Sequence, residues 1–172
     1  MRLYVIGAPG SGKSHVCAKI SDALTIPWFD LNDDVLADLC DQSALETKRQ
    51  WLQLPEWIFE AVFETGVWTE ALECADWVVV LTTPWPIRVF RVVRRFFLRR
   101  FRHEEFRGQS NDETFSHMIH RAYTTWLYDR RLMPAIQEKI EGVATKTLYV
   151  RNNLEVLQMP MLTAYNQEAG QQ

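Results

Sequence analysis

The residues best suited to chemistry form a glycine-rich run near the start of the chain, which ends in Lys13 and Ser14. The run matches the pattern GxxxxGK[ST]; a short apolar β-type segment precedes it and a helical pattern follows it. Glycines let a loop turn its N–H groups toward phosphate oxygens, and the N-terminus of the helix adds a favourable dipole. Lys13 is expected to contact the β- and γ-phosphates of a nucleoside triphosphate, and Ser14 to bind Mg²⁺. The predicted nucleotide-binding residues are Gly7, Ala8, Pro9, Gly10, Ser11, Gly12, Lys13, Ser14 and His15.

Arginines form the second group. Residues 88–107 contain eight arginines and two acids, although the whole chain has a net charge of -3. Like charges at helical spacing repel each other, which favours an anionic ligand, and arginine forks match phosphate geometry. We expect Arg91 and Arg95, nearest the sheet edge, to act in phosphoryl transfer. For the outer arginines, Arg99 and Arg102, a solvated helix face is an equally good interpretation. The arginines that share one helix face are Arg88, Arg91, Arg95, Arg99 and Arg102.

A later helical segment carries Arg121 and the pair Arg130 and Arg131. If this segment pairs with the first arginine-rich helix, its side chains could close over the same phosphates. Arg130 and Arg131 are therefore candidate catalytic residues, and a solvated helix face is the equally weighted alternative.

Carboxylates follow two of the expected strands. Asp30 ends the second strand and Glu60 ends the third, while Asp33 and Asp34 come shortly after the second. A carboxylate at the end of a strand could bind an acceptor, orient its hydroxyl or act as a base. We therefore predict acceptor binding by Asp30, Asp33 and Glu60, and we expect Glu60 to hold Mg²⁺ through water. Helix capping is the alternative for Asp33 and Asp34, and a plain surface acid for Glu60.

The hydrophobic pattern alternates between strand and helix. It predicts strands at 2–6, 27–30, 57–60, 77–81 and 146–150. It predicts helices at 13–24, at 34–54 with a break near 41–43, at 70–75, from Pro86 onward, at 112–141 with a kink near Pro134, and briefly at 152–157. This order indicates an α/β protein with a doubly wound parallel sheet, in which ligands bind at the carboxyl ends of the strands.

The composition restricts the number of domains, the association with membranes and the cellular compartment that we expect. The chain has 172 residues, enough for one domain, and no apolar run of membrane-spanning length, so we expect no membrane partner. Three widely spaced cysteines, Cys17, Cys40 and Cys74, are typical of reduced thiols and indicate a cytoplasmic location.

Together these motifs support a resemblance. The chain resembles the small P-loop nucleotide kinases of the adenylate kinase-like superfamily, and most closely the branch labelled DNA topology modulation proteins. Four features, spread from Met1 to about Val156, carry the resemblance. They are the opening LYVIGAPGSGKS, the segment IPWFDLND, WIFE followed by ADWVVVL, and the arginine-rich helix after Pro84 with its returning helix.

The resemblance implies a three-layer P-loop NTPase fold with a five-stranded parallel sheet and a helical lid. In that arrangement residues 1–87 and 141–160 form the core, 88–131 the lid and helical arm, and 163–172 a polar tail of one domain. Arg91 and Arg95 match the pair at the start of the lid, Asp30 and Asp33 match the acceptor-side carboxylates, and Arg121, Arg130 and Arg131 match the returning arm.

The sequence also departs from the family pattern. Glu60-Ala61 replaces an Asp-Gly pair, and Thr82 replaces an aspartate that commonly follows the fourth strand. The segment 62–64 lacks the arginine with which adenylate kinases grip the acceptor phosphate, so AMP is disfavoured as acceptor.

The expected function is that of an ATP-dependent small-molecule kinase, which uses ATP and Mg²⁺ and phosphorylates a nucleotide or nucleotide-like acceptor. Two alternatives stay open. One is a nucleotide-binding regulator that associates with DNA, with DNA the less favoured partner, and the other is a P-loop NTPase without an acceptor. The sequence is compatible with a monomer or a homodimer.

Overall fold

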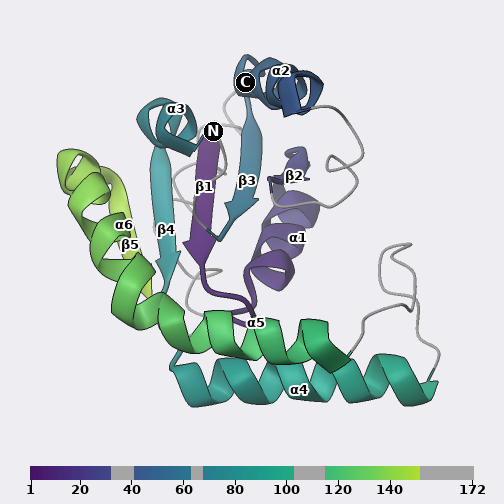
Figure 1. Ribbon diagram of the computed structural model, residues 1–172. Helices are drawn as coiled ribbons and strands as arrows, with labels where there is room; N and C mark the ends of the chain where they lie inside the picture. Colours follow the sequence, from purple (N-terminus) through teal and green to yellow (C-terminus); the bar gives the residue numbers. More distant parts are fainter. Residues whose placement is uncertain (32–40, 63–67, 103–114, 152–172) are drawn as a thin grey trace.

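The computed structural model describes residues 1–31, 41–62, 68–102 and 115–151. It contains five strands that form one sheet, in the order β2-β3-β1-β4-β5, and each neighbouring pair is parallel (Figure 1). The strands are β1 (Arg2–Gly7), β2 (Trp28–Asp30), β3 (Trp57–Ala61), β4 (Trp77–Leu81) and β5 (Thr147–Val150). The helices are α1 (Lys13–Leu24), α2 (Asp41–Leu52), α3 (Trp68–Cys74), α4 (Trp85–Arg102), α5 (Phe115–Leu127) and α6 (Met133–Ile140).

The sheet is the middle of three layers because its strands are apolar on both faces. Alternate residues of β1 point to opposite sides, as the period of two requires. Leu3 and Val5 pack with α1 residues such as Ile20 in one buried cluster. Tyr4 and Ile6 pack with residues of α2, α3 and α6 in the other cluster. The five-stranded parallel α/β fold predicted from the sequence is therefore confirmed.

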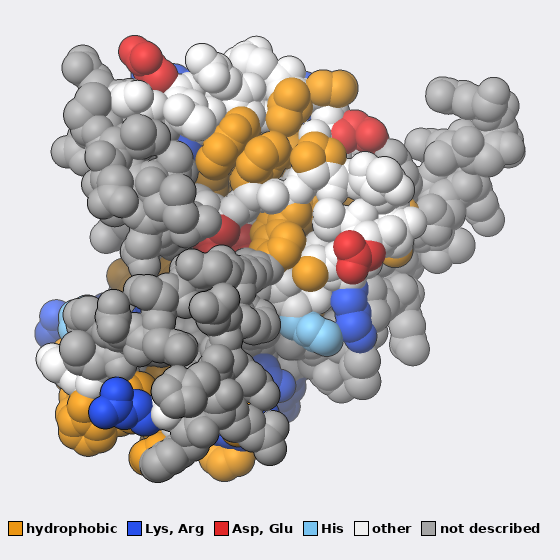
Figure 2. Space-filling view, turned by 90° about the vertical axis from the view of Figure 1, so that its right-hand side faces the viewer, with side chains coloured by type: hydrophobic (Ala, Val, Ile, Leu, Met, Phe, Trp, Pro, Cys, Tyr) orange, Lys and Arg blue, Asp and Glu red, His pale blue; other side chains and the backbone are white. Residues whose placement is uncertain are grey.

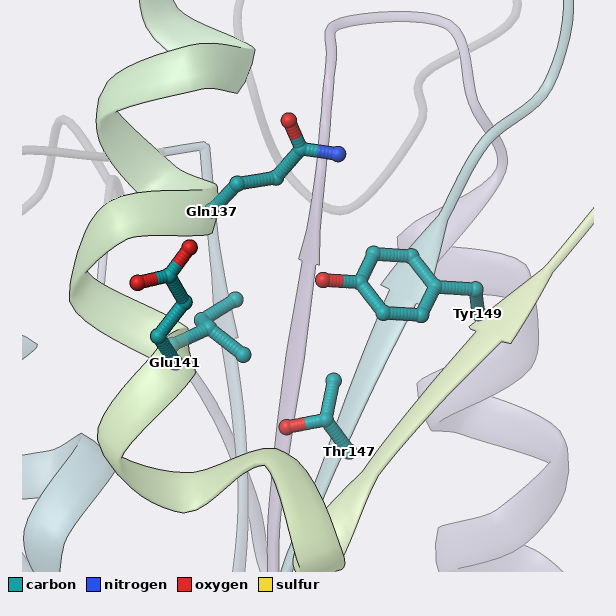
Figure 3. A pocket seen from close by; sticks show the side chains of 5 residues that line it. Gln137, Glu141, Thr147 and Tyr149 are labelled. Atoms are coloured by element: carbon teal, nitrogen blue, oxygen red, sulfur yellow. The ribbon is translucent and has the colours of Figure 1, made fainter.

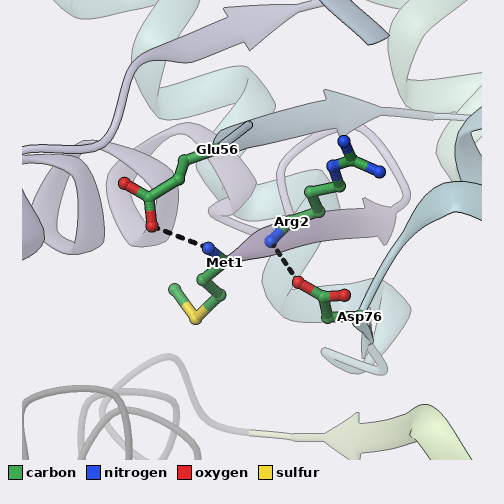
Figure 4. A network of polar contacts seen from close by, with 4 residues as sticks. All are labelled: Met1, Arg2, Glu56 and Asp76. Carbon is green, nitrogen blue, oxygen red and sulfur yellow. Dashed lines mark hydrogen bonds and ion pairs between the residues drawn. The ribbon is translucent and has the colours of Figure 1, made fainter. Parts of the chain in front are cut away.

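Polar contacts hold the amino end of β1 between its two neighbours (Figure 4). The amino group of Met1 pairs with Glu56, which precedes β3, at 2.7 Å. The backbone N–H of Arg2 donates to Asp76, which precedes β4, also at 2.7 Å. These contacts fix the register of the strand that leads into the glycine-rich loop.

The strand boundaries match the predictions to within one residue, and the helix boundaries differ more. The expected kink near Pro134 occurs earlier, because α5 passes into a π-helical turn at Tyr128–Leu132 before α6 begins. Pro134 lies in the first turn of α6, a position that the fixed φ angle of proline suits. A 3-10 turn at Glu141–Lys146 then leads into β5. Residues 34–40, the loop near Gly108, the helix expected at 152–157 and the tail lie outside the described residues.

Helices α4 and α5 form a hairpin at the carboxyl ends of the strands. Figure 1 shows them side by side beneath the arrowheads of β1, β3 and β4. Because the glycine-rich loop follows β1 at this same edge, the hairpin lies directly against it. The local sequence predicted both helices, and the topology brings them to the edge where ligands of parallel sheets bind.

Candidate active site

The glycine-rich loop, residues 8–12, has a backbone that side chains would disturb. Gly10 and Gly12 have φ angles of 77° and 95°, a left-handed conformation that glycine adopts without strain. A Cβ atom on Gly7 would lie 2.8 Å from Ser11 Oγ, and one on Gly10 would lie 2.6 Å from the carbonyl oxygen of Arg88. Glycine is therefore required for two reasons: the left-handed backbone at Gly10 and Gly12, and the neighbouring atoms that leave no room for a Cβ at Gly7 and Gly10.

The carbonyl oxygens of the loop are turned outward and accept hydrogen bonds from several elements. Thr125 of α5 donates to Pro9 O at 3.1 Å, and Thr83, between β4 and α4, donates to Ser11 O at 3.2 Å. Arg91 of α4 donates to Gly10 O at 3.3 Å and to Ser11 O at 3.0 Å. These contacts engage the carbonyls of residues 9–11 from outside the loop. In glycine-rich loops of this type, backbone N–H groups are the donors that bind phosphates.

Lys13 begins α1 and is buried beneath the loop. Its Nζ donates to the carbonyl oxygen of Ala8 at 3.2 Å. Burial lowers the pKa of this amine below its ordinary value of 10.5, while the nearby carboxylates of Glu60 and Asp30 act in the opposite direction. These carboxylates offset only part of the cost of burying the charged amine, so its position suits the phosphates predicted from the sequence.

Ser14 and Glu60 form the second part of the site. The hydroxyl of Ser14 donates to Glu60 Oε1 at 2.6 Å, and Glu60 is buried in β3 beside Val5 of β1. A hydroxyl and a carboxylate are hard oxygen ligands, which fit Mg²⁺ together with phosphate oxygens and water. Among the described residues, no group of three or more His, Cys, Asp or Glu side chains could hold a metal. These two residues therefore fit a metal that is brought in with a nucleotide.

Asp30, the last residue of β2, lies beside Glu60, the last but one of β3, so both carboxylates lie near the carboxyl ends of neighbouring strands. Lys48 of α2, which sequence reasoning missed, donates to Leu31 O at 2.8 Å just beyond Asp30. Partial burial lowers the pKa of Lys48, and Asp30 acts in the opposite direction. Asp33, the other predicted acceptor residue, lies outside the described part of the chain.

Arg88 belongs to the predicted arginine stripe, but the sequence did not single it out as a site residue. The stripe pattern placed it on a cationic face, but the structure buries its side chain almost completely, 1% exposed, beside the loop. Its Nη2 donates to Asp129 at 2.5 Å, its guanidinium lies 5.6 Å from the centre of the Tyr128 ring, and its Nε has no hydrogen-bond partner. The spacing of the arginines showed that Arg88 lies on the same helix face as the other members of the stripe. It did not show that Arg88 is buried, which results from the packing of α4 on the loop. A buried, partly unsatisfied guanidinium beside a phosphate loop is suited to an anion.

The other predicted arginines have different surroundings. Arg91 contacts the outer side of the loop, as described above, and Arg95 is exposed one turn further along α4. Arg130 is exposed and lies 4.5 Å from the ring centre of Trp126, and Arg131 is also exposed. His15, the last predicted nucleotide-binding residue, is exposed as well. Their roles toward a nucleotide stay predictions.

A separate cavity of about 270 Å³ lies between α6 with its following 3-10 turn and the edge strand β5 (Figure 3). Gln137 and Glu141 line it from the helical side, and Thr147 and Tyr149 line it from the strand. Thr147 begins β5, whereas the glycine-rich loop follows the last residue of β1, so the cavity lies away from the phosphate loop.

Comparisons with known proteins add the following findings. No family model matches the sequence, and no curated protein matches it. Among solved structures, the chain is similar to the shikimate kinase of Aquifex aeolicus vf5, with a TM-score of 0.49 and 17% identity over 99% of each chain. It is also similar to the shikimate kinase of Bacteroides thetaiotaomicron, with a TM-score of 0.47 and 15% identity over 100% of this chain and 99% of the other. The α/β fold with a glycine-rich loop after β1 rests on this chain's own strand order and sequence motif. The narrower resemblance to topology modulation proteins stays a prediction.

Proposed function

We propose that this protein is an ATP-dependent kinase that transfers the γ-phosphoryl group, with Mg²⁺, to a hydroxylated or phosphorylated small molecule of nucleotide-like character. The observation that carries the proposal is the buried amine of Lys13 under a complete phosphate loop, one residue before a serine that is hydrogen-bonded to Glu60. This combination supports a site in which a cation, backbone donors and metal ligands would act together on the phosphates.

The roles of the residues follow from their positions. Lys13 and the loop N–H groups would bind the phosphates, and Arg88 and Arg91 would balance charge on the γ-phosphoryl group as it moves. Arg95, Arg130 and Arg131 are further candidates for this second role. Ser14 and Glu60 would hold Mg²⁺, which neutralises charge on the phosphate oxygens when it is bound.

The acceptor is expected to bind beyond the ends of β2 and β3. An acceptor oxygen would form the new bond to the γ-phosphorus as the bond between that phosphorus and the β–γ bridging oxygen breaks, releasing ADP. Asp30, beside Glu60, would orient the acceptor hydroxyl and take its proton, and Lys48, bonded to Leu31 O, would bind a negatively charged part of the acceptor.

The test is ADP formation from Mg-ATP across a panel of nucleosides, nucleoside monophosphates and other hydroxylated metabolites. Acceptor-dependent ADP is expected, and Lys13→Ala should reduce it about 100-fold or more. Lys19→Ala, an exposed lysine on the same helix, is the matched control and should retain activity. Undiminished transfer in Lys13→Ala would refute the proposal.

A second candidate is an NTPase that hydrolyses ATP without an acceptor, and the surroundings of Thr82 favour it. The hydroxyl of Thr82 donates to Val150 O at 3.2 Å, and its N–H donates to the same oxygen at 2.8 Å. The residue therefore joins β4 to β5, at the position where the resembling family carries an aspartate. ADP release that is the same with every member of the panel would support this candidate over the kinase.

A further inference from the structure

The hairpin of α4 and α5 exposes an apolar surface. On α4, Phe90 is 66% exposed and Phe97 is 46% exposed. On α5, Phe115 is 60%, Ile119 is 51% and Tyr123 is 55% exposed. We call Phe90, Phe97, Phe115, Ile119 and Tyr123 the outer face of the hairpin. Large apolar side chains gathered on one surface, unlike scattered ones, indicate an interaction site.

The opposite side of the same two helices is already occupied. The backbone of Arg88 and the side chain of Val92 pack against Gly10, and Thr125 donates to Pro9. Residues 90 and 97 lie on the other side of α4 from residues 88 and 92, according to the helical period. Phe90 and Phe97 therefore point away from the phosphate loop, and a partner could cover them without entering the active site.

The charge of the hairpin restricts what could cover this face. Residues 85–102 and 115–127 contain eight arginines and no aspartate or glutamate. Arg94 and Arg100 are exposed on α4, and just after α5 the exposed Arg130 follows Asp129, whose carboxylate pairs with Arg88. Figure 2 shows orange side chains interspersed with blue ones along the lower edge of the molecule, at the height of the hairpin in Figure 1. A second copy would bring two cationic surfaces together, which is unfavourable, whereas an anionic surface is complementary.

We propose that the outer face of the hairpin docks onto an anionic membrane surface, with its aromatic and aliphatic side chains at the lipid interface and its arginines at the phosphate headgroups. On α4 the exposed Arg94 and Arg100 flank the side that carries Phe90 and Phe97, an arrangement found in helices that lie in the interface plane. Among the described residues, no helix is both long and apolar enough to cross a bilayer. The absence of a spanning run led the sequence to predict no membrane partner, but a helix lying flat on the surface needs no such run.

A single-stranded nucleic acid is also anionic, and its bases stack on apolar side chains, but the outer face suits it less well than a membrane. Base stacking needs free aromatic ring faces. The ring of Trp126 lies near Tyr123 and under Arg130, with centroid distances of 6.0 Å and 4.5 Å, so these rings are already engaged. Phe97 and Phe115 both contact Phe96, and Ile119 offers no ring. Lipid acyl chains need only apolar area, which all these side chains supply.

The test is co-sedimentation of the full chain with vesicles of phosphatidylcholine, with and without phosphatidylglycerol. The wild-type protein should bind the anionic vesicles, and increasing salt should release it. The double variant Phe90→Ser/Phe97→Ser should bind at least about tenfold more weakly because apolar area is lost. Arg94→Glu should weaken binding to the anionic vesicles about fivefold or more, because a cation near the lipid surface is lost.

Two controls make the experiment decisive. Tyr149→Ser removes an aromatic ring that is 52% exposed on the edge strand β5, away from the hairpin, and should leave vesicle binding unchanged. Ile119→Ser/Tyr123→Ser tests the same face from α5, should the α4 variant fold poorly, and thermal melting verifies each variant. Equal binding of the Phe90→Ser/Phe97→Ser and wild-type proteins would overturn the proposal. So would failure to bind vesicles, whether accompanied by oligonucleotide binding or by a dimer that these substitutions dissociate.

Discussion

Lys13 is held where its charge is unfavourable until an anion arrives. Its amine is buried beneath the loop and contacts the carbonyl oxygen of Ala8, which compensates only part of the lost hydration. Burial lowers its pKa, and the carboxylates of Glu60 and Asp30 oppose that shift. The phosphates of a bound nucleotide would favour the protonated amine further and raise the pKa again.

This linkage predicts how nucleotide affinity depends on pH. In the free protein the pKa of Lys13 is below 10.5, so part of the amine loses its proton as pH rises toward that value. ATP binding must then take up a proton, so the affinity for ATP should fall as pH increases. This fall should begin at a lower pH than that at which an ordinary lysine titrates. Calorimetric titration of ATP at several alkaline pH values measures this fall. Lys13→Ala should bind weakly without that alkaline slope, and an unchanged slope in this variant would contradict the assignment.

Glu60 should act on the metal rather than on the phosphates. Glu60→Gln keeps a hydrogen-bond acceptor for Ser14 but removes the negative charge. Because the carboxylate repels phosphates and attracts Mg²⁺, ATP binding without Mg²⁺ should be unchanged or tighter in this variant, whereas Mg-ATP binding should weaken about tenfold. Titrations with Mg²⁺ and with a chelator separate the two effects. Equal weakening under both conditions would show that Glu60 only supports the structure.

At the scale of the element, the hairpin is fastened to the loop through the buried pair of Arg88 and Asp129. The pair is asymmetric, since Arg88 is 1% exposed and the Asp129 side chain is 48% exposed. Removing the carboxylate leaves a buried cation without its main partner, whereas removing the cation leaves a carboxylate that water can reach. The two single substitutions should therefore have unequal costs.

We predict that Asp129→Asn lowers the free energy of unfolding by about 1–3 kcal/mol and Arg88→Met by less. Adding Mg-ATP should offset more of the loss in Asp129→Asn than in Arg88→Met, because the released guanidinium can bind phosphate instead. Urea denaturation with and without nucleotide measures both differences. A larger loss for Arg88→Met, unaffected by nucleotide, would indicate that Arg88 is purely structural.

The sequence patterns predicted the positions of strands and helices better than the burial of individual side chains. The strand β4 was predicted at its observed bounds because Trp77–Leu81 is a short apolar run between turn signals. The arginine stripe of α4 was predicted as a face, but periodicity does not say whether a face meets solvent or a loop far away in the sequence. Arg88 and Lys48 gain their surroundings from contacts that span 41 and 17 residues, which local spacing does not encode. The glycine-rich loop was predictable because its chemistry and its geometry lie in consecutive residues.

At the scale of the whole molecule, the loop is the point where the layers meet. It follows the central strand β1, begins α1, and accepts hydrogen bonds from Thr83, Arg91 and Thr125. Ser14 joins it to β3 through Glu60. A ligand bound there would bridge the loop, β3 and the hairpin, so its binding free energy should stabilise the fold as a unit.

We therefore predict that saturating Mg-ATP raises the melting temperature of the whole chain in one cooperative transition. At a concentration about 100-fold above Kd, binding contributes about 2.7 kcal/mol, which corresponds to about 5–10 °C for a chain of this size. Differential scanning calorimetry measures the shift, which Tyr149→Ser should retain and Lys13→Ala should lose. If the nucleotide shifted only part of a two-step transition, the hairpin would unfold independently of the sheet. The contacts at Pro9, Gly10 and Ser11 would then be too weak to couple them.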